Sequence, residues 1–303
     1  MLGAVDIVHD IVLGPRGRYF LMNLAVAFDN GFIEESGFQT LEHVLWRLGR
    51  DVGYNTRRRG ISPSYTILAR ARKLAPLLEQ VPLIELTPKL IYDALDSTVN
   101  NAAYWEPPSN IDLLLASHPL KRGLLRIAHH VHASPFWIPW SKQFFAEGQS
   151  SVSWKAISAS REDTSLVQSV LSAQDALKMW QAEAMHPDVW WSRPPRTLIR
   201  TSGELEDGIP GSLRFVEDGL GWNIGQVQHA TISPGARVFT INGPDDWVFL
   251  CRRFPREIPM ADRPNWKIAT GYPHDWVIPD YAQVAQYYDG VHLSFQGYLA
   301  TAG

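Results

Sequence analysis

The chain has 303 residues, of which 45% are hydrophobic and 19% are charged, and its formal net charge is −3. This composition is ordinary for a globular protein of one large or two ordinary domains, and it argues against a general nucleic-acid-binding protein, which would be basic. Cys251 is the single cysteine, which excludes a disulfide framework and a cysteine-based zinc site. The start of the chain lacks the basic segment of a signal peptide, and no run is long enough to span a membrane. We therefore expect a cytoplasmic protein with no membrane contact.

The first residues of the chain predict helices. Apolar residues between positions 5 and 12 follow the helical period, and Gly14-Pro15 ends that segment. Residues 19–28 form a continuous apolar run that fits either a buried helix or a buried strand. An apolar helical face follows at 38–48.

Helices are also expected through the middle of the chain. Pro63 marks the start of one helix, and Thr87-Pro88 is a cap and first-turn pair that indicates another, because Thr87 can accept from the free amides of the first turn. The further predicted helices lie at 111–116, 119–131 and 164–184.

The sequence changes character after residue 190. A β-type run at 197–199, a strand at 236–241, a helical turn from Pro244 and a final helix–strand pair ending at 290–294 follow one another. This order predicts an α+β protein in which a mainly helical domain, residues 1–190, packs on a smaller mixed α+β domain, residues 191–303. Polar, cationic and aromatic residues collect at the ends of these elements, where sites are usually built.

Histidines cluster at 129–132. On a helix, His129 and His132 share a face at a spacing that a metal could use, while His130 points elsewhere. A zinc site needs a third ligand and usually a carboxylate, and none stands at a recognised spacing. A helix end that is rich in histidine is also favoured by the helix dipole. The sequence therefore predicts no metal site.

The candidate ligand site lies at the start of the C-terminal part. Arg200 offers a planar fork for a carboxylate or diphosphate, and the Thr201 and Ser202 hydroxyls can hold backbone or a ribose. Downstream, Glu217 supplies a carboxylate and Trp222 a ring for stacking. The alternative is structural: an arginine paired with a surface carboxylate beside a turn. Both interpretations stay open at this point.

Three runs in the C-terminal part carry a resemblance: 216–222, 235–239 and 288–293 continuing through 297–299. In these runs the chain resembles actinobacterial proteins of unassigned function, over roughly residue 104 to the end. That family implies no activity, and it implies a further aromatic strand beyond the equivalent of Gly303. More remotely, the strand–Arg–hydroxyl start is similar to the first motif of ADP-ribosyltransferases. The Ser-Thr-Ser strand of that family is absent, and His292 stands where its later glutamate is expected.

The leading functional hypothesis is an enzyme that binds a nucleotide-like substrate and transfers ADP-ribose from NAD, with no tightly bound cofactor. One alternative is a non-catalytic binding or accessory protein that uses aromatic and arginine anchors, and another is a metal-dependent enzyme built on the histidines. In the leading hypothesis Arg200, Thr201, Ser202 and Trp222 bind the substrate, and Glu217 or His292 acts at the reacting ribose.

Overall fold

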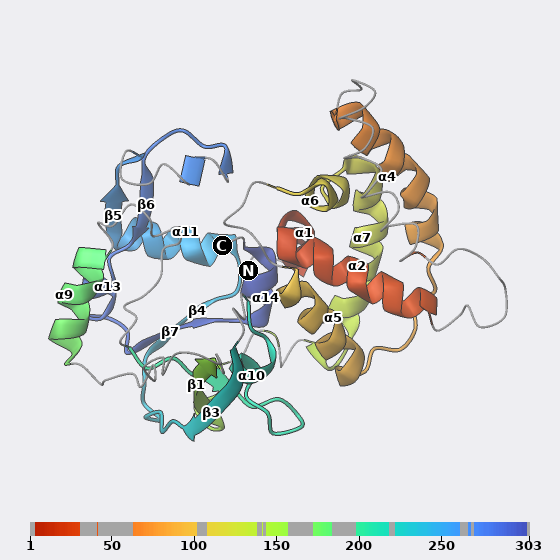
Figure 1. Ribbon diagram of the computed structural model, residues 1–303. Helices are drawn as coiled ribbons and strands as arrows, with labels where there is room; N and C mark the ends of the chain where they lie inside the picture. The colour runs from red at the N-terminus through yellow and green to blue at the C-terminus, as the bar shows by residue number, and fades with distance from the viewer. Residues whose placement is uncertain are drawn as a thin grey trace.

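The computed structural model describes residues 4–30, 41, 63–101, 108–137, 141, 144–156, 172–183, 198–217, 222–260, 266–267 and 270–301. They form an all-helical group, which lies to the right in Figure 1, and a group built from short strands and helices, which lies to the left. The α+β class and the order of a helical N-terminal part before a mixed C-terminal part are confirmed.

The helical group follows the predicted boundaries closely. It contains α1 (Ala4–Leu13), α2 (Pro15–Asn30), α4 (Pro63–Gln80), α5 (Pro88–Asn100), α6 (Asn110–Leu115), the 3₁₀ helix His118–Leu120 and α7 (Lys121–Ala133). Residues 19–28, which fitted a helix or a strand, are helical. The predicted helix at 38–48 lies outside the described residues except for Leu41, which is buried.

Local chemistry explains where these helices begin. The Thr87 side chain accepts a hydrogen bond from the Leu90 amide, with Pro88 in the first turn of α5. At α6, Ser109 and Asp112 form a reciprocal capping box. Each cap satisfies amides that the helix itself leaves unpaired, so the start of each helix is encoded within a few residues.

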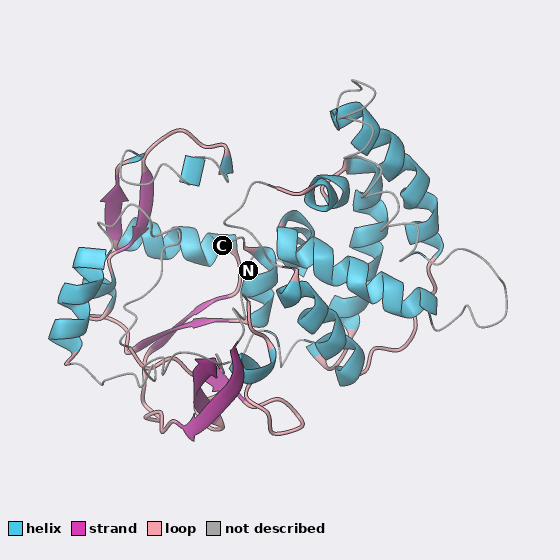
Figure 2. Cartoon of the chain, viewed as in Figure 1, coloured by secondary structure: helices cyan, strands magenta, loops and turns pink. Residues whose placement is uncertain are grey.

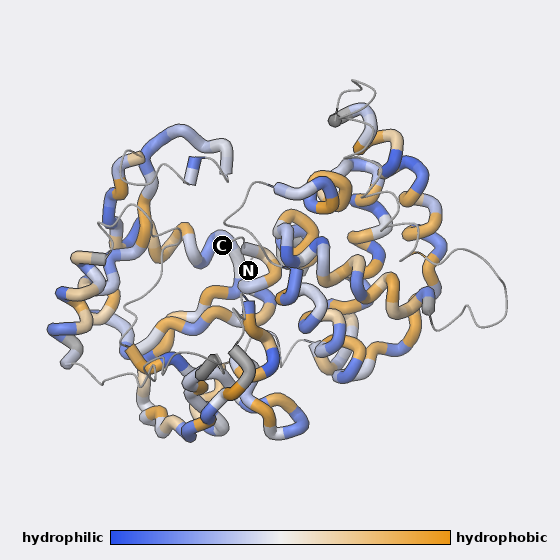
Figure 3. The backbone as a smooth tube through the Cα atoms, viewed as in Figure 1, coloured by the Kyte–Doolittle hydropathy of each residue, from blue (hydrophilic) through white to orange (hydrophobic). Residues whose placement is uncertain are grey.

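One apolar cluster holds the helical group together. Apolar residues from all of the helices, orange in Figure 3, supply this cluster. Its largest fully buried side chains include Trp137, Phe20 and Phe28, and the first two stack with ring centroids 5.6 Å apart. The core of the helical part is therefore built mainly from aliphatic residues around these rings, with Leu205 and Leu299 of the mixed group added to it.

The mixed group combines short strands with short helices (Figure 2). The strands are β1 (Gln149–Ala156), β2 (Ser202–Gly203), β3 (Trp222–His229), β4 (Val238–Ile241), β5 (Pro255–Ile258), β6 (Trp276–Pro279) and β7 (Gly290–Leu293). The helices are α9 (Ala173–Glu183), α10 (Gly211–Arg214), α11 (Pro244–Arg253), α13 (Tyr281–Val284) and α14 (Phe295–Ala300).

The strands pair in three separate small sheets. β1 is central in the order β2-β1-β3 and pairs antiparallel with both neighbours, β4 pairs parallel with β7, and β5 pairs antiparallel with β6. In the first sheet Ser151 lies opposite Gln228 and Ser153 opposite Gln226. These four side chains therefore share one face.

The mixed group draws on residues from both sides of position 190. β1 precedes that position, yet it pairs with β2 and β3. α9 also precedes it, and its Trp180 is buried in a second apolar cluster with Leu250, Phe254 and Tyr281. Of the predicted helix at 164–184, α9 is the part that is described, apart from Ser172 just before it.

α14 joins the two groups. It packs against α1 and α2, and its Leu299 is buried in the helical core. Close approach is enforced at two glycines: a Cβ on Gly297 would lie 2.2 Å from the Ile241 carbonyl oxygen, and one on Gly14 would lie 2.2 Å from the Leu299 carbonyl oxygen. α14 thus touches the end of β4 on one side and the helical group on the other.

None of the helices within the described residues is long and apolar enough to cross a membrane.

Candidate functional site

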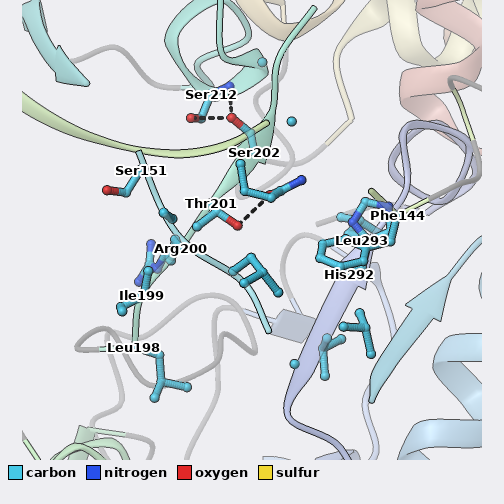
Figure 4. A pocket seen from close by; sticks show the side chains of 18 of the residues that line it. Phe144, Ser151, Leu198, Ile199, Arg200, Thr201, Ser202, Ser212, His292 and Leu293 are labelled. Atoms are coloured by element: carbon cyan, nitrogen blue, oxygen red, sulfur yellow. Dashed lines mark hydrogen bonds between the residues drawn. The ribbon is translucent and has the colours of Figure 1, made fainter. Parts of the chain in front are cut away.

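A partly open cavity of about 1910 Å³ lies in the mixed group. Its walls come from the β2-β1-β3 sheet, from the segment before β2, and from β7 with the start of α14. Leu198, Ile199 and Arg200 line one side, and Phe144, His292 and Leu293 line the other (Figure 4). Sites for drug-sized ligands are typically about 300–1,000 Å³. This cavity is therefore large enough for a dinucleotide.

The segment that leads into β2 carries the predicted cation. The Arg200 side chain is exposed and lines the cavity beside Leu198 and Ile199, whose exposed fractions are 40% and 66%. The β-type run was predicted at 197–199. Residues 198 and 199 are the described part of it, and they precede β2, which contains only Ser202 and Gly203. Two apolar side chains and one guanidinium thus face a shared space, which suits a ligand with a ring and an anionic group.

The two predicted hydroxyls lie beside Arg200, but both bond to other protein groups. Thr201 Oγ1 donates to Gln149 Oε1 at 2.7 Å. Ser202 Oγ donates to Ser212 Oγ at 2.7 Å and accepts from the Ser212 amide at 2.8 Å. These bonds, which are dashed in Figure 4, hold the segment in place. Each oxygen retains acceptor capacity for a ligand.

His292 stands on the opposite wall, in the middle of β7. Its register partner on β4 is Thr240, and its ring lies 5.4 Å from the Phe144 ring. Burial lowers the pKa of His292 below its ordinary value of 6.5, because a partly desolvated site disfavours the imidazolium. The ring is therefore neutral at neutral pH and can accept a proton.

Glu217 also lines the cavity, but its carboxylate accepts hydrogen bonds from Arg16 and Tyr298. Arg16 Nε donates to Glu217 Oε1 at 2.6 Å, and Arg16 NH2 donates to Oε2 at 3.0 Å. The Tyr298 hydroxyl donates to the same carboxylate, and the Arg16 guanidinium lies 4.6 Å from the Tyr298 ring centroid. The two parallel bonds make this a bidentate pair, and Arg16 is almost fully buried. Together with Tyr298, the pair links α2 to the segment after α10 and to α14.

Trp222 begins β3, where its backbone pairs with Ala156. Its side chain lies outside the described residues, so the predicted stacking on a ligand ring stays a prediction. The cavity thus brings together Arg200, Thr201, Ser202, Glu217 and His292, all of which the sequence singled out.

The structure adds wall residues that the sequence did not indicate. The first sheet lines the cavity with Ser151, Ser153, Gln226 and Gln228, and with Gln149 at the start of β1. The alternation of residues 149–156 between two faces is the sequence signal for this strand. Ser150, Val152 and Trp154 lie on one face, and Ser151 and Ser153 lie on the other.

A second constellation on the same sheet only superficially suits nucleophilic catalysis. Ser150 Oγ lies 3.4 Å from His229 Nδ1, and Glu204 Oε1 lies 3.8 Å from the same ring nitrogen. In a catalytic triad the histidine contacts the nucleophile through one ring nitrogen and the carboxylate through the other. Here Ser150 and Glu204 both contact Nδ1 of His229. Ser150 is also fully buried. These residues therefore do not form a catalytic triad.

The histidine cluster lies on α7 in the helical group, and none of its residues is among those that line this cavity. His130 Nε2 contacts the Ile84 carbonyl oxygen at 2.7 Å, and its ring packs edge-on against Phe28. Across the described residues, no group of three or more His, Cys, Asp or Glu side chains is arranged to hold a metal ion. His130 thus takes part in the packing of the helical group.

Comparisons of the chain with protein-family models, with curated proteins and with solved structures found no match.

Proposed function

We propose that the protein is an enzyme that binds a nucleotide-like substrate in the cavity, with ADP-ribosyl transfer from NAD as the reaction. The observation that supports this proposal is that Arg200 and His292, which are 92 positions apart, line the same cavity of about 1910 Å³. A pocket with a cation on one wall and a titratable group of perturbed pKa on another is a typical setting for catalysis.

Arg200 is the residue we assign to the diphosphate. Its planar fork can donate two parallel hydrogen bonds to an anionic oxygen pair. Leu198 and Ile199 expose apolar surface beside it, which suits a base or nicotinamide ring. The substrate would then span from this segment toward His292 on the other wall.

His292 is the residue we assign to proton transfer. In the proposed reaction the bond between the ribose C1′ and the nicotinamide nitrogen breaks, and a bond from C1′ to an acceptor oxygen or nitrogen forms. Nicotinamide leaves as a neutral molecule, and the neutral imidazole takes the proton that the acceptor loses. Glu217 suits this role less well, because its carboxylate already accepts hydrogen bonds from Arg16 and Tyr298.

A non-catalytic binding protein is the second candidate. It is favoured by the way the polar groups of Thr201, Ser202 and Glu217 are engaged by other protein groups. In that case the cavity would bind a nucleotide-like ligand without converting it, and Arg200 would keep the same role.

Calorimetric titration with NAD tests the binding step. We expect Arg200→Lys to weaken binding by roughly 10–150-fold, because it keeps the charge but loses the bidentate fork, which is worth about 1.5–3 kcal/mol. Arg252→Lys is the matched control, since Arg252 is exposed on α11 and does not line the cavity. Absence of binding to the wild-type protein at millimolar NAD would discard ADP-ribosyl transfer from NAD and leave the binding protein, with another ligand, as the better candidate.

Release of nicotinamide, followed by chromatography, separates the two candidates. The enzyme should release nicotinamide from NAD, and His292→Gln should abolish release while binding of NAD persists. Binding without any release by the wild-type protein, also with added acceptor peptides or nucleic acid, would favour the binding protein.

A further inference from the structure

Gln149, the first residue of β1, is a buried polar residue whose side-chain amide is hydrogen-bonded at both its nitrogen and its oxygen. Its exposed fraction is 5%. Nε2 donates to the Phe145 carbonyl oxygen at 2.8 Å, and Oε1 accepts from Thr201 Oγ1 at 2.7 Å. A buried amide is costly unless both of its ends are hydrogen-bonded, and here both are.

The backbone of Gln149 makes the same residue a junction of three segments. It pairs with Gly203 of β2, and its carbonyl oxygen accepts from the Ala230 amide at 2.8 Å, just beyond the end of β3. Gln149 therefore contacts the segment before β1, the segment that carries Arg200, and the segment that follows β3.

The side-chain bonds of Gln149 lead to both walls of the cavity. Thr201 directly follows Arg200, and β2 is only two residues long, so few ladder bonds fix this segment. On the other side, Phe145 adjoins Phe144, whose ring packs against His292. One buried amide thus connects the wall that carries Arg200 to the segment that supports His292.

We propose that Gln149 is a positioning residue, which fixes the placement of Arg200 relative to His292. The inference rests on the proposed function for its ligand, whereas the placement itself can be measured without any ligand. Gln149 acts through Thr201 and Phe145 and contributes no catalytic group. Preorganised walls lower the cost of ordering a site when a ligand binds.

A double-mutant cycle with NAD as the probe tests this role. Gln149→Met has nearly the same volume and removes both side-chain hydrogen bonds, so we expect a loss of affinity of roughly tenfold. If Gln149 acts through Arg200, then Arg200→Lys should cost much less in the Gln149→Met background than in the wild type. Gln228→Met is the matched control: it removes a cavity-lining amide on the neighbouring strand β3, where Gln228 lies opposite Ser151, and its effect should add to that of Arg200→Lys. Additive effects of Gln149→Met and Arg200→Lys would overturn the proposal.

A milder pair of variants covers a failure of Gln149→Met to fold. Thr201→Val removes one of the two bonds, whereas Thr201→Ser keeps the hydroxyl that donates to Gln149. We expect Thr201→Val to weaken NAD binding and Thr201→Ser to restore it. Equal affinities for the two variants would contradict the role of this bond.

Hydrogen exchange on the ligand-free protein separates this inference from the proposed function. The amides of 198–203 should exchange faster in Gln149→Met, or in Thr201→Val, while those of α2 exchange as in the wild type. Unchanged exchange at 198–203 in a folded variant would refute the positioning role, whatever NAD does. Faster exchange in a protein that does not bind NAD would support the role and reject the nucleotide ligand.

Discussion

The helical group and the mixed group are stabilised in different ways. The helical group buries a continuous, mainly aliphatic cluster between helices of up to 18 residues. The mixed group has three small sheets with strands of two to eight residues, and its cluster is rich in aromatic rings such as Trp180, Trp266 and Tyr281. The candidate site lies in the mixed group. There, side-chain hydrogen bonds hold cavity-lining residues such as Thr201 and Ser202 in place. Short strands form few backbone hydrogen bonds with their neighbours. Side-chain hydrogen bonds such as those of Gln149 can replace them in the walls of a wide cavity.

The two groups meet at α14 and at the Arg16–Glu217 pair. Arg16 also donates to the Thr301 carbonyl oxygen at 3.2 Å, so the start of α2 contacts the end of α14. Because Glu217 lines the cavity, the helical group reaches the candidate site through this pair. If the two groups are coupled, weakening the junction should destabilise the whole protein.

The largest effect is expected at the Arg16–Glu217 ion pair, in which the Arg16 side chain is buried and the Glu217 side chain is 29% exposed. Glu217→Gln leaves the Arg16 guanidinium, 8% exposed, without its full counter-charge. Removing one partner of a buried pair typically costs about 3–5 kcal/mol. We expect a loss of this order in the free energy of unfolding, measured by urea denaturation followed by circular dichroism.

The control for this experiment is the exposed Arg237–Asp289 pair. Its side chains are 57% and 48% exposed, so solvent screens the pair and Asp289→Asn should cost much less than Glu217→Gln. Equal losses for the two variants would mean that Arg16 and Glu217 do not couple the groups. A Glu217→Gln variant of unchanged stability that lost turnover would instead return the catalytic role to Glu217.

A somewhat smaller effect is expected at Gly297, where α14 touches the end of β4. Alanine normally stabilises a helix relative to glycine by up to about 1 kcal/mol. Here the new Cβ would meet the Ile241 carbonyl oxygen at 2.2 Å, and backbone atoms cannot move aside as a flexible side chain can. We expect Gly297→Ala to destabilise the protein by about 3 kcal/mol, at the upper end of the cost of overpacking.

Gly235→Ala is the matched comparison for Gly297→Ala. A Cβ at Gly235 would meet no atom within 4 Å, so this change should be neutral or slightly stabilising. The urea midpoints of both variants measure the difference. A neutral Gly297→Ala would show that α14 and β4 are not held in close contact.

The same contrast explains what could be predicted from the sequence. The helix starts at Thr87 and Pro63 were predictable because caps and apolar periods act within a few residues. β1 was missed, although residues 149–156 alternate in polarity, since its partners on β3 lie between 66 (Ala156 to Trp222) and 79 (Ser150 to His229) positions away. Pairing over such distances has no local signature.

The candidate site was predictable in its chemistry but not in its contacts. Arg200 and His292 were identified from residue type and from position at the ends of elements, and both line the cavity. The bond from Arg16 to Glu217 joins residues 201 positions apart, so the sequence could not distinguish an engaged carboxylate from a catalytic one. Gln149 was missed because its importance lies only in the partners that folding provides.

The smallest effect, and the one that bears most directly on the mixed group, is the pH dependence of stability at His292. Burial lowers the pKa of this imidazole in the folded protein below 6.5, whereas the unfolded chain has the ordinary value. Between the two values the unfolded state binds the extra proton, so the free energy of unfolding falls as the pH drops below about 6.5 and stops falling below the folded pKa. Urea midpoints at pH 7.5 and 5.0 should therefore differ less in His292→Gln than in the wild type. His118→Gln, which changes an exposed histidine beside α7 in the helical group, should keep the wild-type difference. If His292→Gln also kept that difference, the imidazole would not be desolvated against Phe144, and its assignment as the neutral proton acceptor of the cavity would lose its physical basis.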